Sequence, residues 1–187
     1  MDVKIISSII LGLGLSAAVG FRIFVPALIT AVAGYYDAIE LIESMQWMTS
    51  MPAIITLSVA TIAEILAFYI PFVDNLLDTV ATPAAAICGT LLMGSTIVEM
   101  EPLIKWPISI IAGGGLATAV QSGTSVVRAT SSGLTAGMGN PFVSTLEAIL
   151  ATIMSFLSIL LPVAAGAVIL YITYRFIIKK RLKPKAS

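Results

Sequence analysis

The chain has 187 residues, of which 58% are hydrophobic and only 11% are charged. Soluble domains carry about a quarter charged residues, so this composition excludes an ordinary soluble domain and is typical of a membrane protein. Ten Lys and Arg residues balance ten Asp and Glu residues, and five of the ten basic residues lie in the last nine positions. A short basic run after an apolar helix favours a cytoplasmic helix end over a nucleic-acid-binding segment.

Two features of the composition narrow the chemistry further. The sequence has no histidine and a single cysteine, Cys88. These counts exclude an intramolecular disulfide, a zinc site of the usual His/Cys type and a Ser-His-Asp or Cys-His catalytic arrangement. Cys88 lies among apolar residues, where a thiol usually serves only for packing. We therefore expect no cofactor.

Residues 5–34 form the first apolar segment, which is long enough to cross a bilayer with some tilt. Its start is compatible with a secretory signal peptide, but hydrophobicity resumes after Arg22, so we favour a retained first span. Pro26 removes one backbone hydrogen bond and predicts a kink just after Arg22. Either this is a broken functional helix, or Arg22 pairs with an acid on a neighbouring helix.

The next two apolar segments carry carboxylates. Residues 35–50 are amphipathic and include Trp47, which suits the membrane interface. Residues 51–70 form a second span that Glu64 interrupts, and an isolated carboxylate there must be paired, protonated or facing water. Asp74 and Asp78 follow with an i, i+4 spacing that places both on one helix face at the start of a third span, residues 76–98. They either bind a cation, relay protons or stabilise a helix N-terminus, the commonest of the three.

The fourth segment, residues 108–136, is unusually polar for a membrane helix. Arg128 lies in its middle near Gln121, Ser122 and Thr124. Such groups are costly in hydrocarbon unless they face other helices or water, so this segment is expected to line a polar seam. A turn at residues 137–141 leads to a fifth span, residues 142–171, with Glu147 near its start.

The sequence thus predicts an all-α integral membrane protein with about five transmembrane helices, some of them kinked or broken. Residues 1–178 form a single transmembrane domain and residues 179–187 a basic cytoplasmic tail. Five spans with the tail in the cytoplasm place the N-terminus outside, in agreement with the positive-inside rule. If the third segment is only re-entrant, four spans remain and the N-terminus lies inside.

The two ends of the chain resemble each other. The sequence GLSAAV at residues 14–19 matches GLATAV at residues 115–120, and an arginine follows each within the same helix. Each of these helices is followed by a turn, a proline and a span that contains an acid. Five spans arranged as two, one and two would give an inverted repeat, the layout of many transporters.

Several short motifs resemble those of one known family. They are Gly12-x-Gly14 with Pro26, Glu64 followed by Pro71, Asp74 and Asp78, the segment TPAAAICGTLL, and the series Gln121, Arg128, Asn140-Pro141, Ser144 and Glu147. Over residues 10–170 the chain resembles small prokaryotic integral membrane proteins named only as a domain of unknown function. The resemblance implies a prokaryotic plasma membrane and places five of the charged residues at the family's polar positions: Glu64, Asp74, Asp78, Arg128 and Glu147. It implies no activity.

Three functions fit these features. The first is a small transporter or channel that moves an ion or small polar solute through a seam between spans one and four. The pathway residues would be Arg22, Glu64, Asp74, Asp78, Gln121, Ser122, Thr124, Arg128 and Glu147. The second is a membrane scaffold or assembly subunit whose buried charges are structural ion pairs. The third, an enzyme acting on metal-bound phosphate or lipid through Asp74 and Asp78, lacks a second acidic motif.

The partners expected for the first function are the lipid bilayer and a small ion or polar solute, with no nucleic acid. Five short spans enclose little volume, so a pathway could require a homodimer.

Overall fold

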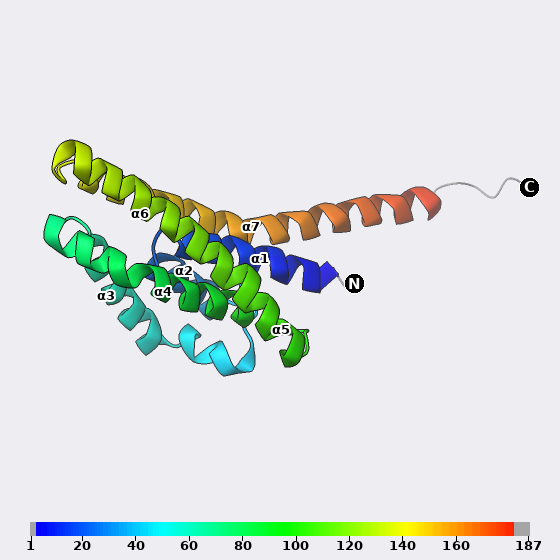
Figure 1. Cartoon of the computed structure of the whole chain (residues 1–187). Coiled ribbons are helices and arrows are strands. Elements are labelled where there is room, and N and C mark those ends of the chain that lie inside the picture. The colour runs from blue at the N-terminus through cyan, green and yellow to red at the C-terminus, as the bar shows by residue number, and fades with distance from the viewer. Residues whose placement is uncertain (1–2, 182–187) are drawn as a thin grey trace, which may run out of the picture.

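The computed structural model describes the backbone from Val3 to Arg181, and the side chains except those of residues 1–3, 71–72, 74–75 and 163–187. The described chain is entirely helical, as the sequence predicts (Figure 1). Its α-helices are α1 (Val3–Val19), α2 (Phe24–Tyr35), α3 (Met51–Ala67), α4 (Pro71–Thr96), α5 (Pro102–Ile108), α6 (Gly115–Thr135) and α7 (Asn140–Arg181). A 3-10 helix, η1 (Glu43–Thr49), precedes α3, and a π-helix, η2 (Ser109–Gly114), joins α5 to α6.

The helix boundaries follow from local sequence. The Ser50 hydroxyl accepts a hydrogen bond from the Ala53 amide at the start of α3 (3.4 Å), and Pro71 opens α4. Proline is tolerated in a first turn because its missing N–H would have no partner within the helix. Ala136 and Gly137 adopt left-handed backbone angles (φ 52° and 85°), which end α6 and turn the chain into α7.

Three described segments are long and apolar enough to cross a membrane: Leu76–Thr96, Pro102–Thr135 and Asn140–Pro162. The η1–α3 pair, bent by 68° at its break, makes a fourth if it is counted as one span. The protein is therefore an all-helical, multi-pass membrane protein. The predicted interfacial segment contains η1, where Trp47 is exposed.

The first predicted span is not a single helix. The chain breaks at residues 20–23, and α2 runs back along the direction from which α1 came (Figure 1). Two contacts establish the return: Lys4 pairs with Glu99 (3.2 Å), and the Ile42 amide donates to the Ser95 carbonyl (2.9 Å). Both lie at the C-terminal end of α4, which we call the Glu99 end. The α1–α2 segment is thus a hairpin with Arg22 at its tip, and we call it the re-entrant hairpin because it enters and leaves the helix bundle at the Glu99 end.

Pro26 has a different role from the one predicted. It is the third residue of α2 and does not kink a continuous helix. A first-turn position has no intrahelical partner for an N–H, so proline fits there without loss. The break itself, which the sequence predicts close to Arg22, is present in the structure.

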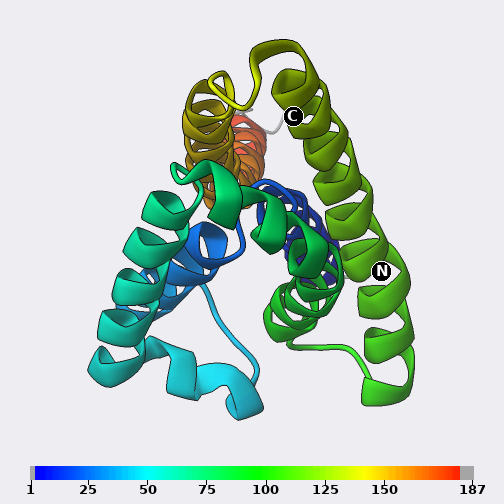
Figure 2. The same cartoon turned by 60° about the vertical axis from the view of Figure 1, so that its left-hand side comes forward.

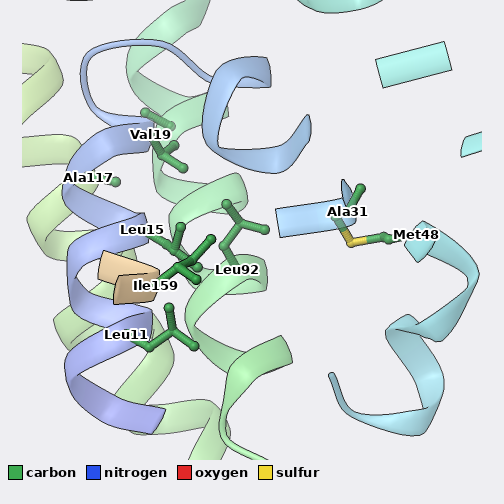
Figure 3. Packing of buried hydrophobic residues seen from close by; sticks show 9 residues of the cluster. Leu11, Leu15, Val19, Ala31, Met48, Leu92, Ala117 and Ile159 are labelled. Atoms are coloured by element: carbon green, nitrogen blue, oxygen red, sulfur yellow. The ribbon is translucent and has the colours of Figure 1, made fainter. Parts of the chain in front are cut away.

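Helix α1 forms the centre of the bundle. Its residues Leu11, Leu15 and Val19 are buried against Leu92 of α4 and Ile159 of α7 (Figure 3). Small residues allow the helices to approach closely. The Ser16 hydroxyl donates to the Gly89 carbonyl (2.8 Å), and a Cβ at Gly14 would overlap the Ser158 side chain. Figure 2 shows α3 and α6 on opposite sides of this centre.

Helix α1 runs antiparallel to α4, because Gly12 lies beside Thr96 while Ser16 reaches Gly89. Helix α6 is also antiparallel to α4, to which a short turn at the Glu99 end joins it through α5 (Figure 1). Helices α1 and α6, which carry the two similar sequences, therefore run in the same direction. Helix α7 returns to the Glu99 end, where Lys4 and Pro162 line the same hollow.

Candidate functional site

Glu64 holds the tip of the re-entrant hairpin. The break before α2 leaves the first amides of that helix without helical partners. The two carboxylate oxygens of Glu64 accept hydrogen bonds from the Ile23 amide (2.8 Å) and the Phe24 amide (3.0 Å). The positive end of the α2 dipole also favours a carboxylate at this position. The predicted intramembrane acid therefore fastens α3 to the hairpin.

Next to the tip lies a buried network of charges, which we call the ion cluster: Arg22, Asp78, Arg128 and Glu147. Arg128 binds Glu147 with two hydrogen bonds, Nε to Oε1 (3.1 Å) and Nη2 to Oε2 (2.7 Å). Its Nη1 lies 3.1 Å from Oδ1 of Asp78. Arg22 Nη2 lies 3.2 Å from the same Oε2 of Glu147, so the two arginines share one carboxylate oxygen.

The ion cluster is almost fully removed from solvent and from lipid. Arg22 and Arg128 are each 1% exposed and Glu147 is 3% exposed, while the Asp78 side chain keeps 18% exposure. Arg22 also donates to the carbonyl (3.0 Å) and the hydroxyl of Ser144. The cluster thereby joins the hairpin tip, α4, α6 and α7. Arg22 thus lies at a helix break and also pairs with an acid of another helix, Glu147, while a functional role for the break stays a prediction.

Phe68 packs against both arginines of the ion cluster and also lines the cavity that Glu64 borders, and sequence reasoning did not identify it. The Cζ atoms of Arg22 and Arg128 lie 3.9 Å and 4.2 Å from the centroid of its ring, within the range of cation–π attraction. The ring is 5% exposed. An aromatic residue at the end of an apolar helix is common, so the sequence offers no signal for this contact.

A cavity of about 520 Å³ is lined by Phe68 among other residues. Its walls come from the hairpin tip, α3, α4 and α6. Most lining residues are apolar, and the polar ones are Glu64, Gln121 and Cys88. The volume is within the range of small-molecule sites, which are usually apolar with a few polar groups.

Four predicted pathway residues remain. Three of them lie on two faces of α6, and the fourth, Asp74, lies on α4. Gln121 and Thr124 are buried, and the Thr124 hydroxyl donates to the Gln121 carbonyl (2.9 Å). Ser122 is exposed on the outer surface. The side chain of Asp74 lies outside the described residues, so its predicted pairing with Asp78 on one face stays a prediction. Across the described side chains, no group of three or more His, Cys, Asp or Glu residues could hold a metal ion.

A second hollow, of about 290 Å³, opens at the Glu99 end. It is lined by residues from α1, the segment after α2, the C-terminal end of α4 with the residues that follow it, and the middle of α7, among them Lys4, Glu40 and Glu99. The Lys4 and Glu99 side chains are 79% and 45% exposed, so their ion pair contributes little to stability.

A re-entrant hairpin, three or four membrane-crossing segments and a buried ion cluster define this chain as a polytopic helical membrane protein. Residues 9–180 match the model of a domain of unknown function, DUF4126. Since the match covers nearly the whole chain, the protein belongs to the DUF4126 family, and the resemblance found in the sequence is confirmed. No curated protein and no solved structure matches the chain.

Proposed function

We propose that the protein is a small transporter or channel that moves an ion or small polar solute across the membrane. The observation that carries the proposal is the re-entrant hairpin, whose tip lies between an ion cluster and a cavity. Non-helical backbone inside a membrane is tolerated where it is buried in protein or lines a cavity. Transporters commonly bind their solutes beside such broken helices, and intramembrane charges commonly mark their pathways.

The proposed pathway runs from the cavity, past Phe68, into the ion cluster. Glu147 is the centre of this pathway because both arginines bind its Oε2 atom. A proton or cation that reaches Glu147 would release a guanidinium, and an anion would compete with Glu147 for one. Partner exchange of this kind would couple solute binding to movement of the helices. Next to the hairpin tip, Gly20 packs directly against Val120 of α6.

The alternative is a scaffold in which the same ion pairs only hold the helices together. The close bidentate geometry of Arg128 and Glu147 favours this reading, because such pairs satisfy buried charge well. We do not propose an enzyme, since Asp78 has an arginine partner where a metal-dependent enzyme would need a second carboxylate. A homodimer also stays a proposal.

We further propose that the protein lies in a prokaryotic plasma membrane with the Glu99 end in the cytoplasm. Lys4 and Lys105 lie at this end, and α7 continues from it toward the basic tail, of which residues 182–187 lie outside the described chain. Four crossing segments would then place both termini in the cytoplasm. This differs from the N-out arrangement expected from five spans. The inverted repeat has no support from α1 and α6, since an inversion requires opposite helix directions.

Flux through proteoliposomes tests the proposal. Purified protein would be reconstituted and assayed with a panel of small cations, small anions and protons. We expect flux of at least one solute in the wild type, loss of that flux in Arg128→Ala, and wild-type flux in Glu43→Ala, an exposed acid of η1. Absence of flux for every solute in folded wild-type protein would favour the scaffold.

A further inference from the structure

The charges around Phe68 do not balance. Among the described side chains, which do not include that of Asp74, two guanidinium groups, those of Arg22 and Arg128, lie near three carboxylates, those of Asp78, Glu147 and Glu64. Asp78 and Glu147 make ion pairs with the arginines. Glu64 makes no ion pair with any described residue, because its bonded partners are two neutral backbone amides. Among the described side chains, carboxylates around Phe68 therefore outnumber guanidinium groups by one, and Glu64, which has no direct ion pair there, is the carboxylate that borders the cavity.

Glu64 borders the cavity and keeps capacity for a ligand. Each carboxylate oxygen can accept more than one hydrogen bond, and in this structure each accepts one from the backbone. The Glu64 side chain is only partly buried and is among the lining residues. Both oxygens are thus fixed in position by the hairpin while one face of the carboxylate borders open volume.

The rest of the cavity wall selects against a bare metal ion and against an anion. A metal ion needs several oxygen ligands, whereas most of the lining side chains here are hydrocarbon. An anion would be repelled by the Glu64 carboxylate that borders the cavity. The rings of Phe21 and Phe24 line the same space. Aromatic rings and a carboxylate together attract an organic cation.

We propose that this cavity is a binding site for an organic cation with an apolar body. Glu64 is its counter-ion, Phe21 and Phe24 contact its charged centre, and the alanine-rich walls of α3 and α4 hold its apolar part. A volume of about 520 Å³ accommodates a cation of drug-like size. This site gives the proposed function a class of solute. The claim that the bound cation is also transported rests on that proposed function.

A purely structural role for Glu64 explains its two hydrogen bonds, but it leaves the cavity beside this carboxylate unexplained. The two readings differ in what they predict for ligands of equal shape and opposite charge. Tetraphenylphosphonium and tetraphenylborate are such a pair. Equilibrium dialysis of radiolabelled ions against detergent-solubilised protein, with empty micelles subtracted, measures both.

We expect the wild type to bind tetraphenylphosphonium saturably and at least tenfold more tightly than tetraphenylborate. Glu64→Gln should weaken binding of the cation at least tenfold, and Glu43→Gln, which removes an exposed acid far from the cavity, should not. Equal binding of the two ions, equal affinity in Glu64→Gln, or no saturable binding by the wild type would each overturn the proposal.

A second variant keeps the test decisive if Glu64→Gln does not fold. Ala84→Phe fills the cavity from α4 and leaves the capping carboxylate in place, and Ala119→Phe adds the same bulk on the outer face of α6. Only Ala84→Phe should abolish cation binding, and retained binding in this variant would refute the site.

Cation binding without flux of any solute would refute the transport function alone. Flux of another solute without cation binding would refute this site alone.

Discussion

Because two arginines share Glu147, substitutions in the ion cluster should differ in how strongly they destabilise the protein. Glu147→Gln removes the carboxylate that contacts both guanidinium groups, so it breaks two buried ion pairs at once. Loss of one partner from a buried pair costs about 3–5 kcal/mol, and we expect Glu147→Gln to destabilise the protein by that amount. Arg128→Gln leaves Glu147 with Arg22 at 3.2 Å, so its cost should be smaller, about 2–3 kcal/mol.

Asp78→Asn should be the mildest of the three changes. Its side chain is 18% exposed, and the amide oxygen of asparagine can still accept from Arg128. We expect a loss of about 1 kcal/mol. The assay is unfolding of detergent-solubilised protein in a titration with SDS, followed by circular dichroism. Glu43→Gln, an exposed substitution in η1, is the control and should change stability by less than about 0.5 kcal/mol. If Arg128→Gln costs as much as Glu147→Gln, the shared carboxylate is not the centre of the cluster.

Two further predictions concern packing and topology. Gly89→Ala should destabilise the bundle by about 1–3 kcal/mol, because its Cβ would lie 2.5 Å from that of a neighbouring alanine, whereas Gly123→Ala meets open space and should be neutral or stabilising in the same titration. In a Cys88→Ser background, Ser7→Cys and Glu40→Cys should react with an impermeant maleimide from the same side of the membrane. Reaction from opposite sides would contradict the re-entrant hairpin.

The sequence predicted the fold class but not the path of its first segment. Hydropathy shows that residues 5–34 form a long apolar segment. One tilted span and two half-length helices would have the same hydropathy, so it does not distinguish them. The outcome depends on whether another helix supplies hydrogen-bond partners for the backbone amides at the break. Glu64 provides this by capping the Ile23 and Phe24 amides from a distant position in the chain. No local pattern in residues 5–34 contains that information.

The ion cluster was partly predictable. Buried charges in apolar helices must find partners, and this rule predicts that Arg22 and Arg128 pair with acids such as Glu64 or Glu147. It does not predict that Asp78 joins the cluster while Glu64 binds backbone amides. Helical periodicity would also have separated Ser122 from the inner face, since positions 121, 124 and 128 share one side of an α-helix and position 122 does not. The contact of Phe68 with both arginines was not predictable, because it depends on how α3 ends relative to the hairpin.

The central claim is that the ion cluster belongs to a transport pathway. The most direct test is flux through the charge-balanced double variant Arg128→Gln/Asp78→Asn, which removes one positive and one negative charge and leaves the Arg22–Glu147 pair in place. If Arg128 and Asp78 only hold helices together, removing both should leave the protein folded with the flux of the wild type. If they belong to the pathway, the flux should be lost although the protein is folded. We predict a monodisperse protein, more stable than Arg128→Gln alone, that transports none of the solute moved by the wild type. Wild-type flux in this variant would contradict the claim.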